Sequence, residues 1–218
     1  MQLSALTHEI RNLLQPVDYH VSVMAARPTD DPQIARALSV IPKQLELLQQ
    51  LLANVSIYTN PIELNPRRVE LRRCIQSAVN RLNASPETRD AEITLNGLSQ
   101  PTFAMLDEYW IPIALEHLFR NAIEAVAKAG DKKITVDLSI IKSVIYIRIL
   151  DCGPGIDAQV ASSLFQPFAT TKEQAGAGFG LALTKKILEA HGGTVTLSRG
   201  TDPVATCATV TIPFVAAS

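Results

Sequence analysis

The chain has 218 residues, of which 47% are hydrophobic and 19% charged, so it is long and apolar enough for one large domain or two small ones. A formal net charge of −1, without a long tail of one sign, argues against a nucleic-acid partner. Three scattered cysteines without metal-ligand spacing predict reduced thiols in a cytoplasm, and neither a signal peptide nor an apolar stretch long enough to cross a bilayer is visible.

Residues 1–60 carry two heptad patterns of apolar side chains, which predict a helical hairpin. The first pattern contains Leu3, Leu6, Ile10, Leu13, Val17 and Met24. The second contains Ile34, Leu38, Ile41, Leu45, Leu48, Leu52 and Val55. The proline-containing stretch 26–32 between them is the expected loop. Further apolar residues widen the second stripe beyond what one hairpin covers, so we expect two hairpins to form a four-helix dimer.

Three polar residues stand close together in the first helical pattern. His8 lies at the heptad position farthest from the apolar seam, so its imidazole is expected to point to solvent. Glu9 follows it directly, and Asn12 lies one helical turn beyond His8 on the same face. A lone histidine on a helix surface predicts only a solvated side chain, so a function for His8 depends on these neighbours and on the motifs downstream.

After a proline-containing linker at residues 58–66, the pattern changes to mixed α and β structure. Helices are expected at 71–82 and 108–129. Strands are expected from Val69 and at 92–98, 102–107, 133–141, 144–150, 193–198 and 205–214. The chain therefore predicts an α-helical hairpin followed by a separate α/β domain.

Two glycine runs, 151–156 and 176–181, suit the close approach of a ligand to the backbone. The second run leads into a helical pattern, and the free N–H groups at a helix start bind phosphate well. Neither run has the spacing of a P-loop or of the dinucleotide fingerprint. Upstream, Asn121 lies in a helical pattern and offers a carboxamide oxygen suited to a hard metal ion. Together these features predict a nucleotide site of another type.

Taken in order, these motifs resemble the sensor histidine kinases of two-component signalling. The segment 7–16 resembles the H box, Asn121 lies in a segment like the N box, and 151–156, 164–168 and 176–181 resemble the G1, F and G2 boxes. The resemblance covers residues 8–214. It implies a dimerisation and phosphotransfer hairpin at 1–60, forming a four-helix bundle on dimerisation, and a catalytic ATP-binding domain at 67–218. That domain is expected to be an α/β sandwich of the Bergerat type, which histidine kinases share with gyrase, Hsp90 and MutL.

The resemblance also assigns roles to individual residues. His8 is expected to take the γ-phosphoryl group of ATP and pass it to an aspartate of a response regulator. Glu9 is expected to act as the base that assists His8, and Asn12 to orient water for dephosphorylation of the regulator. Asn121 is expected to ligate Mg²⁺ between the phosphates, and Asp151 to accept a hydrogen bond from the adenine amino group.

The other cofactor-binding candidates lie in the two glycine runs and the lid between them: Gly153, Gly155, Lys172, Gly176, Gly178, Gly180 and Leu181. Lys172 either approaches a phosphate or is an ordinary solvated charge. Two positions depart from the pattern of the family. His117 stands where many relatives carry Asn and where the ATPases carry a glutamate base, which argues against gyrase-like hydrolysis. Leu13 replaces the usual H-box proline and Pro16 follows three residues later, so the helix bend is expected farther from His8.

The expected partners are a second copy of the chain, the receiver domain of a response regulator, and a sensor domain located upstream or in trans. The expected location is the cytoplasm, either for this chain alone or as the cytoplasmic part of a longer sensor. Two alternatives stay open. One is a non-catalytic histidine phosphotransferase that relays phosphate between regulators. The other is an ATPase or serine kinase of the same fold, which would leave His8 and the hairpin unexplained.

Overall fold

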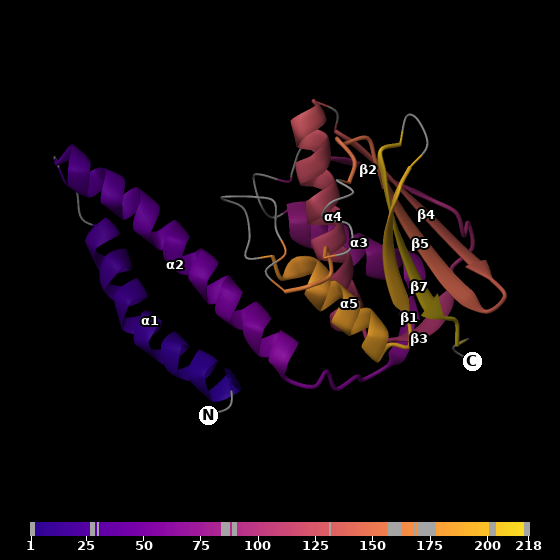
Figure 1. Cartoon of the computed structure of the whole chain (residues 1–218), viewed down its shortest axis with the longest axis horizontal. Coiled ribbons are helices and arrows are strands. Elements are labelled where there is room, and N and C mark those ends of the chain that lie inside the picture. Colours follow the sequence, from indigo (N-terminus) through magenta and orange to yellow (C-terminus); the bar gives the residue numbers. More distant parts are fainter. Residues whose placement is uncertain are drawn as a thin grey trace. The chain divides into compact units, whose positions relative to one another are not determined.

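The computed structural model describes residues 3–26, 29, 31–83, 88, 91–130, 132–156, 163–167, 169, 178–200 and 204–215 (Figure 1). Its contacts divide the chain into two compact units, which are described separately here. One unit comprises Met1–Pro61 and Thr170–Phe179, and the other comprises Ile62–Ala169 and Gly180–Ser218. The domain boundaries expected from the sequence, at residues 60 and 67, stay a prediction.

The first unit is built on the predicted helical hairpin, with α1 at Leu3–Ala25 and α2 at Pro32–Thr59 (Figure 1). Asp31 caps α2 because its side chain accepts hydrogen bonds from the backbone N–H groups of Gln33, at 2.8 Å, and of Ile34, at 3.4 Å. Each helix continues through an internal proline, Pro16 in α1 and Pro42 in α2. In the part of the chain described, no helix is long and apolar enough to cross a membrane.

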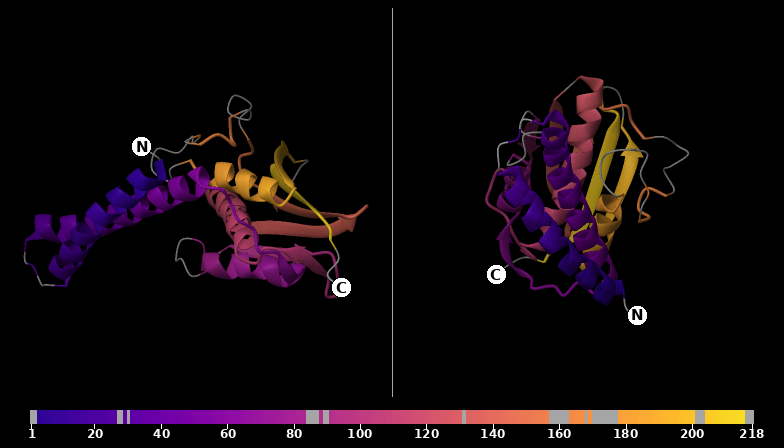
Figure 2. Two further views of the ribbon diagram at one scale, coloured as in Figure 1. Left: turned by 90° about the horizontal axis from the view of Figure 1, so that it is seen from below. Right: turned by 90° about the vertical axis from the view of Figure 1, so that its left-hand side faces the viewer.

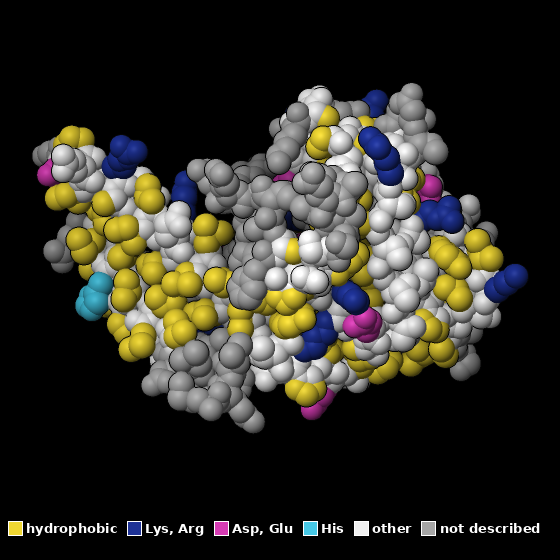
Figure 3. Space-filling model, viewed as in Figure 1, with side chains coloured by type: hydrophobic (Ala, Val, Ile, Leu, Met, Phe, Trp, Pro, Cys, Tyr) yellow, Lys and Arg dark blue, Asp and Glu magenta, His cyan; other side chains and the backbone are white. Residues whose placement is uncertain are grey.

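Much of the apolar surface of the hairpin is open. In α2, Leu45 and Leu52 are the buried residues, whereas Leu13 in α1 is 68% exposed. Figure 3 shows many apolar side chains, in yellow, over the hairpin. Besides Leu13, the exposed large apolar residues here are Val17, Tyr19, Val23, Met24, Ile34, Val40, Ile41, Leu47 and Leu48. A single hairpin therefore leaves most of its predicted seam uncovered.

The second unit contains a five-stranded mixed sheet in the order β2-β4-β5-β7-β6. The strands are β2 (Glu92–Asn96), β4 (Lys133–Ile141), β5 (Val144–Asp151), β6 (Thr194–Arg199) and β7 (Thr206–Pro213). The pair β2 and β4 is parallel, and the other pairs are antiparallel. Lys142 and Ser143 both have positive φ in the two-residue turn between β4 and β5, as a type I′ hairpin requires.

Three helices cover one face of this sheet: α3 (Leu71–Asn83), α4 (Trp110–Ala129) and α5 (Gly180–Ala190) (Figure 2). Alternate residues of β4 and β5 are buried beneath them, and Phe119 of α4 is fully buried in the same core. The helices α4 and α5 are also joined by Thr184, whose Oγ1 donates to the Ala114 carbonyl at 3.2 Å. A small second sheet pairs β1 (Arg67–Glu70) with β3 (Phe103–Leu106). The predicted fold, a helical hairpin followed by an α/β sandwich, is confirmed.

Candidate nucleotide site

One stripe of helix α4 runs between the two glycine runs. His117, Asn121 and Ala125 are spaced one helical turn apart, so they share a face of the helix, and all three are half-buried. At one end of the stripe, a Cβ placed on Gly180 would lie 3.3 Å from Nδ1 of His117. At the other end, a Cβ placed on Gly153 would lie 2.6 Å from Cβ of Ala125. Asn121 therefore lies midway between the end of β5 and the start of α5.

Asp151 closes the β5 end of this site. It is the last residue of β5, it is 5% exposed, and its Oδ1 accepts a hydrogen bond from the Gly153 N–H at 3.0 Å. Burial raises the pKa of Asp151 above its ordinary value, although the bonds from Gly153 and from the Thr206 side chain work in the opposite direction. A buried acceptor of this kind suits a ligand that presents an N–H or NH₂ group.

The two glycines that follow Asp151 are needed for different physical reasons. Gly153 is limited by space, because a side chain there would meet both Ala125 and Asp151. Gly155 has room, since a Cβ there would meet only the Ala205 carbonyl at 3.7 Å, but its φ of +83° lies in the left-handed region. Together they let the backbone turn closely past the stripe on α4.

The other end of the stripe meets the start of α5. The helix begins at Gly180 and has no acidic residue in its first turn, so its N-terminal N–H groups and dipole favour an anion. The imidazole of His117 faces this end, and burial lowers its pKa, although the neighbouring Glu116 opposes the shift. The ring is therefore neutral near pH 7, with one N–H to donate and one nitrogen to accept. The two ends of the site thus differ, with a carboxylate at one and N–H donors at the other.

The remaining site candidates are placed as follows. Gly178 is described with a φ of +68°, and Leu181 packs against the core of the second unit. In α1, Asn12 is exposed, while only the backbone of His8 and Glu9 is described. Lys172 and Gly176 lie outside the described residues, as does Phe168 of the segment like the F box. The structure therefore brings together Asn121, Asp151, Gly153 and Gly180, and the roles of all the candidates stay predictions.

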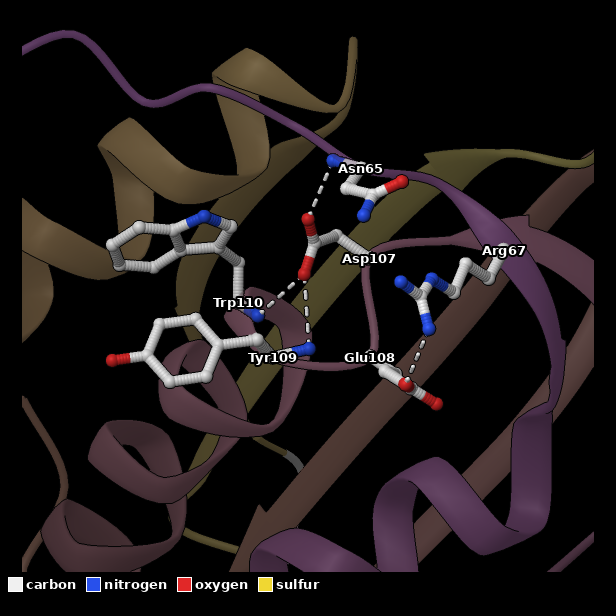
Figure 4. A network of polar contacts seen from close by, with 6 residues as sticks. All are labelled: Asn65, Arg67, Asp107, Glu108, Tyr109 and Trp110. Carbon is white, nitrogen blue, oxygen red and sulfur yellow. Dashed lines mark hydrogen bonds and ion pairs between the residues drawn. The ribbon is translucent and has the colours of Figure 1, made fainter.

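Sequence reasoning missed Asp107, which was read only as the end of a strand. This side chain is 5% exposed and accepts hydrogen bonds from three backbone N–H groups, those of Asn65, Tyr109 and Trp110 (Figure 4). A signal was available, because an aspartate directly before an apolar periodic pattern is a typical helix cap. The contact with Asn65, 42 residues earlier in the chain, left no such signal.

The fold and this site define a class of protein, an ATP-binding α/β sandwich that follows a helical hairpin. Residues 107–216 match the family model of the histidine kinase-, DNA gyrase B- and HSP90-like ATPases, and the chain belongs to this family. Its hairpin and ATPase domain together form a histidine kinase catalytic core, related to the sensor histidine kinases.

Three curated relatives illustrate the similarity. The sensor histidine kinase ZraS of Escherichia coli (strain K12) is 26% identical over 192 residues, which cover 88% of this chain and 41% of ZraS. The signal transduction histidine-protein kinase AtoS of the same strain is 27% identical over 203 residues, covering 88% of this chain and 31% of AtoS. Sporulation kinase D of Bacillus subtilis (strain 168) is 23% identical over 216 residues, covering 96% of this chain and 41% of that kinase. The chain thus spans less than half the length of these relatives.

Solved structures share the fold. Full-length ShkA in complex with AMPPNP superposes with a TM-score of 0.80 at 21% identity, covering 100% of this chain and 46% of ShkA. The Acinetobacter baumannii histidine kinase AdeS superposes with a TM-score of 0.63 at 22% identity, covering 95% of this chain and 98% of that chain. At these identities the likeness extends to the fold alone.

Proposed function

We propose that this chain transfers the γ-phosphoryl group of ATP to His8, and from His8 to an aspartate of a response regulator. The observation that carries the proposal is the stripe of His117, Asn121 and Ala125 on α4, with a buried acceptor at one end and the start of α5 at the other. This arrangement supports a nucleotide lying along α4, with its base at Asp151 and its phosphates toward Gly180.

Each end of the site fits one part of ATP. The Asp151 carboxylate accepts a hydrogen bond from the adenine amino group, which favours adenine over guanine because guanine presents a carbonyl there. The phosphates take hydrogen bonds from the N-terminal N–H groups of α5. The lid candidates Lys172, Gly176 and Gly178 complete this end in the proposal.

Asn121 is the proposed ligand of Mg²⁺. In the part of the chain described, no group of three His, Cys, Asp or Glu side chains could hold a metal ion by itself. This fits Mg²⁺, which keeps several waters and is commonly held by one or two protein oxygens together with substrate phosphates. When bound, the ion neutralises charge on the transferring phosphoryl group. The half-buried carboxamide of Asn121, midway along the stripe, is well placed to supply a protein oxygen.

In the proposed reaction, an unprotonated ring nitrogen of His8 attacks the γ-phosphorus of ATP. An N–P bond forms, the bond from the γ-phosphorus to the bridging oxygen breaks, and ADP leaves. Glu9 accepts the proton from the other ring nitrogen or holds the orientation of the ring. The regulator aspartate then takes the phosphoryl group from His8, and Asn12 orients a water for the later dephosphorylation of the regulator.

The open apolar face of the hairpin supports a homodimer. Its exposed side chains, such as Leu13 at 68% and Met24 at 54%, would be covered by the same face of a second hairpin. A sensor domain, upstream or in trans, would act through this bundle. Because ATP is the substrate, we place the reaction in the cytoplasm.

The test is incubation with γ-³²P-labelled ATP and Mg²⁺, followed by acid treatment, for the unaltered chain, His8→Gln and Asn121→Ala. His20→Gln, an exposed histidine of the same helix, and Asn80→Ala, an exposed asparagine of α3, are the matched controls. We expect acid-labile label on the unaltered chain and on both controls, and none on the two site variants. Acid-stable label would indicate the serine kinase alternative. Label accepted only from a phosphorylated regulator would indicate the relay alternative.

A further inference from the structure

The linker that enters the second unit is tied to the start of helix α4. The backbone N–H of Asn65 donates to Oδ2 of Asp107 at 2.8 Å, and the Trp110 indole Nε1–H donates more weakly to the Glu63 carbonyl at 3.4 Å. Figure 4 shows the Asp107 carboxylate between Asn65 on one side and the first residues of α4 on the other. Two points of the linker are thus held by two residues at the start of the helix that carries Asn121.

The two carboxylate oxygens of Asp107 accept hydrogen bonds from different parts of the chain. Oδ1 accepts from the backbone N–H groups of Tyr109, at 2.9 Å, and Trp110, at 3.1 Å, while the Asp107 carbonyl accepts from Ile111 at 3.2 Å. This is the geometry of a helix cap, so Oδ1 serves α4 and leaves Oδ2 for the linker. Because the carboxylate is buried and each bond is assisted by its charge, these are strong contacts.

Asp107 is also held by His191, the residue that follows α5. Nε2 of His191 lies 3.4 Å from the Asp107 N–H, and Nδ1 of His191 lies 2.8 Å from the Ile187 carbonyl. One neutral tautomer satisfies both contacts, with Nδ1 donating and Nε2 accepting. The nearby ion pair of Arg67 with Glu108 is different in kind, since it is 3.8 Å long and both side chains are more than 60% exposed.

The clamp shortens the flexible part of the linker. Helix α2 ends at Thr59, and Asn60 is fixed to it because its N–H and its Nδ2 both donate to the Ser56 carbonyl. With Asn60 fixed and Glu63 held, the free stretch is residues 61–62, which spans at most about 7 Å. Without the clamp the next fixed point is β1 at Arg67, so the free stretch becomes residues 61–66 and spans up to about 20 Å.

We propose that Asp107 and Trp110 are positioning residues for phosphoryl transfer, which clamp the linker to α4 and so keep the tether between the hairpin and the ATP-binding domain short. The inference rests on the proposed kinase function. A shorter tether raises the effective concentration of His8 at the nucleotide, and this concentration falls roughly as the −3/2 power of tether length. Growth of the free stretch from two residues to six then lowers the transfer rate about fivefold.

Asp107→Asn separates the clamp from the helix cap. The amide oxygen still accepts from Tyr109 and Trp110, but the amide NH₂ then faces the N–H of Asn65, and two donors meet. Trp110→Phe removes the weaker contact, with Glu63, and keeps an aromatic ring in place. Only the double variant Asp107→Asn/Trp110→Phe releases the linker as far as Arg67. Glu108→Gln is the matched control, because it changes a neighbouring carboxylate to an amide and breaks only the exposed pair with Arg67.

Three quantities are measured on each variant: hydrogen exchange at the Asn65 amide, the Kd for Mg²⁺-ATP, and the rate of His8 labelling at saturating ATP. For Asp107→Asn we expect roughly tenfold faster exchange at Asn65, since a bond to a charged group is lost. We also expect an unchanged Kd in every variant. The labelling rate should not change in Asp107→Asn alone, because Trp110 still holds Glu63, and it should fall about fivefold in the double variant Asp107→Asn/Trp110→Phe. Trp110→Phe should lower the rate by a smaller factor, and Glu108→Gln should change none of the three.

An unchanged or higher labelling rate in the double variant Asp107→Asn/Trp110→Phe, with Asn65 exchanging faster, would overturn the positioning role. A Kd that weakens in parallel with the rate would also overturn it, because the residue would then be merely structural. If Asp107→Asn does not fold, Trp110→Phe decides the question by the same criteria. Absence of label on the unaltered chain would refute the kinase function and the positioning role together, whereas protection of the Asn65 amide in that sample reports separately on the clamp.

Discussion

Gly153→Ala tests the close approach between the loop after β5 and helix α4. The added methyl group would lie 2.6 Å from Cβ of Ala125, 3.0 Å from the Ala125 carbonyl carbon and 3.0 Å from Oδ1 of Asp151. Carbon atoms pack best at about 3.5–4.0 Å, so the loop must move by roughly 1 Å. The two contacts with Ala125 involve its backbone and its short side chain. These atoms cannot swing away as the end of a long side chain would.

The cost has two parts. Overpacking of this kind costs about 1–3 kcal/mol. Movement of the loop also stretches the bond from the Gly153 N–H to the buried Asp151 carboxylate, and such a bond is worth about 1.5–3 kcal/mol. Partial loss of that bond gives a total of roughly 2–4 kcal/mol, which lowers the Tm of a domain of this size by roughly 5–15 °C. The same displacement should weaken ATP binding.

The assay is a double-mutant cycle with Ala125→Gly, followed by thermal and urea unfolding. Ala125→Gly removes the nearest of the three contacts, at its own cost of about 1 kcal/mol in a helix. We therefore expect the double variant to be more stable than the sum of the single effects predicts, by about 1 kcal/mol. Additive effects, within about 0.5 kcal/mol, would refute the steric account of Gly153.

Four further outcomes are expected. Burial raises the pKa of Asp151, and the proposed contact with adenine needs the ionised carboxylate. ATP affinity measured by calorimetry should therefore fall as the pH is lowered, and the fall should begin at a higher pH than for an aspartate with an ordinary pKa. Asp151→Asn should flatten this pH dependence. Burial raises the pKa of Cys74 to about 12, so iodoacetamide at pH 8 should leave it unmodified in the folded protein, and native labelling seen by mass spectrometry would contradict this. Burial alone would raise the pKa of Asp107, but the hydrogen bonds from backbone N–H groups outweigh burial and lower this pKa. The ionised carboxylate therefore contributes fully to stability above the ordinary pKa of about 3.9, and this contribution is lost as the pH falls through the lower pKa of the folded state. Urea unfolding of Asp107→Asn should not show this loss of stability in acid. Leu48→Glu should convert a dimer to a monomer in light scattering, and a monomeric unaltered chain would contradict the bundle.

The local pattern of the chain was enough to predict the elements of the fold. In the strands 133–141 and 144–151, buried residues alternate with less buried ones on either side of a two-residue turn. The same alternation is present in the amino-acid sequence. The neighbours of each strand were not visible. The sequence predicted the two strands at 193–198 and 205–214, but the insertion of β7 between β5 and β6 depends on contacts across more than fifty residues.

The residues of the site could be predicted from the sequence, but the contacts between them could not. Asn121, Asp151 and the glycines were found because their motifs are continuous in sequence. Two contacts were not predictable from any single segment: Gly153 packs on Ala125, and Gly180 lies against His117. Both depend on how β5, α4 and α5 come together in the fold. The clamp on the linker was missed for a further reason, because two of its contacts use backbone groups whose side chains play no part.

The place of β7 in the sheet also has a consequence for the order of events during synthesis. Because β7 (Thr206–Pro213) lies between β5 and β6, the sheet cannot close until these eight residues have left the ribosome. The hairpin is complete at Thr59, and at about 5–20 residues per second the stretch from there to Pro213 takes roughly 8–30 s to translate. The apolar face of the hairpin is thus displayed on the nascent chain well before the ATP-binding domain can fold, so the proposed dimer would have time to form between neighbouring chains on one messenger.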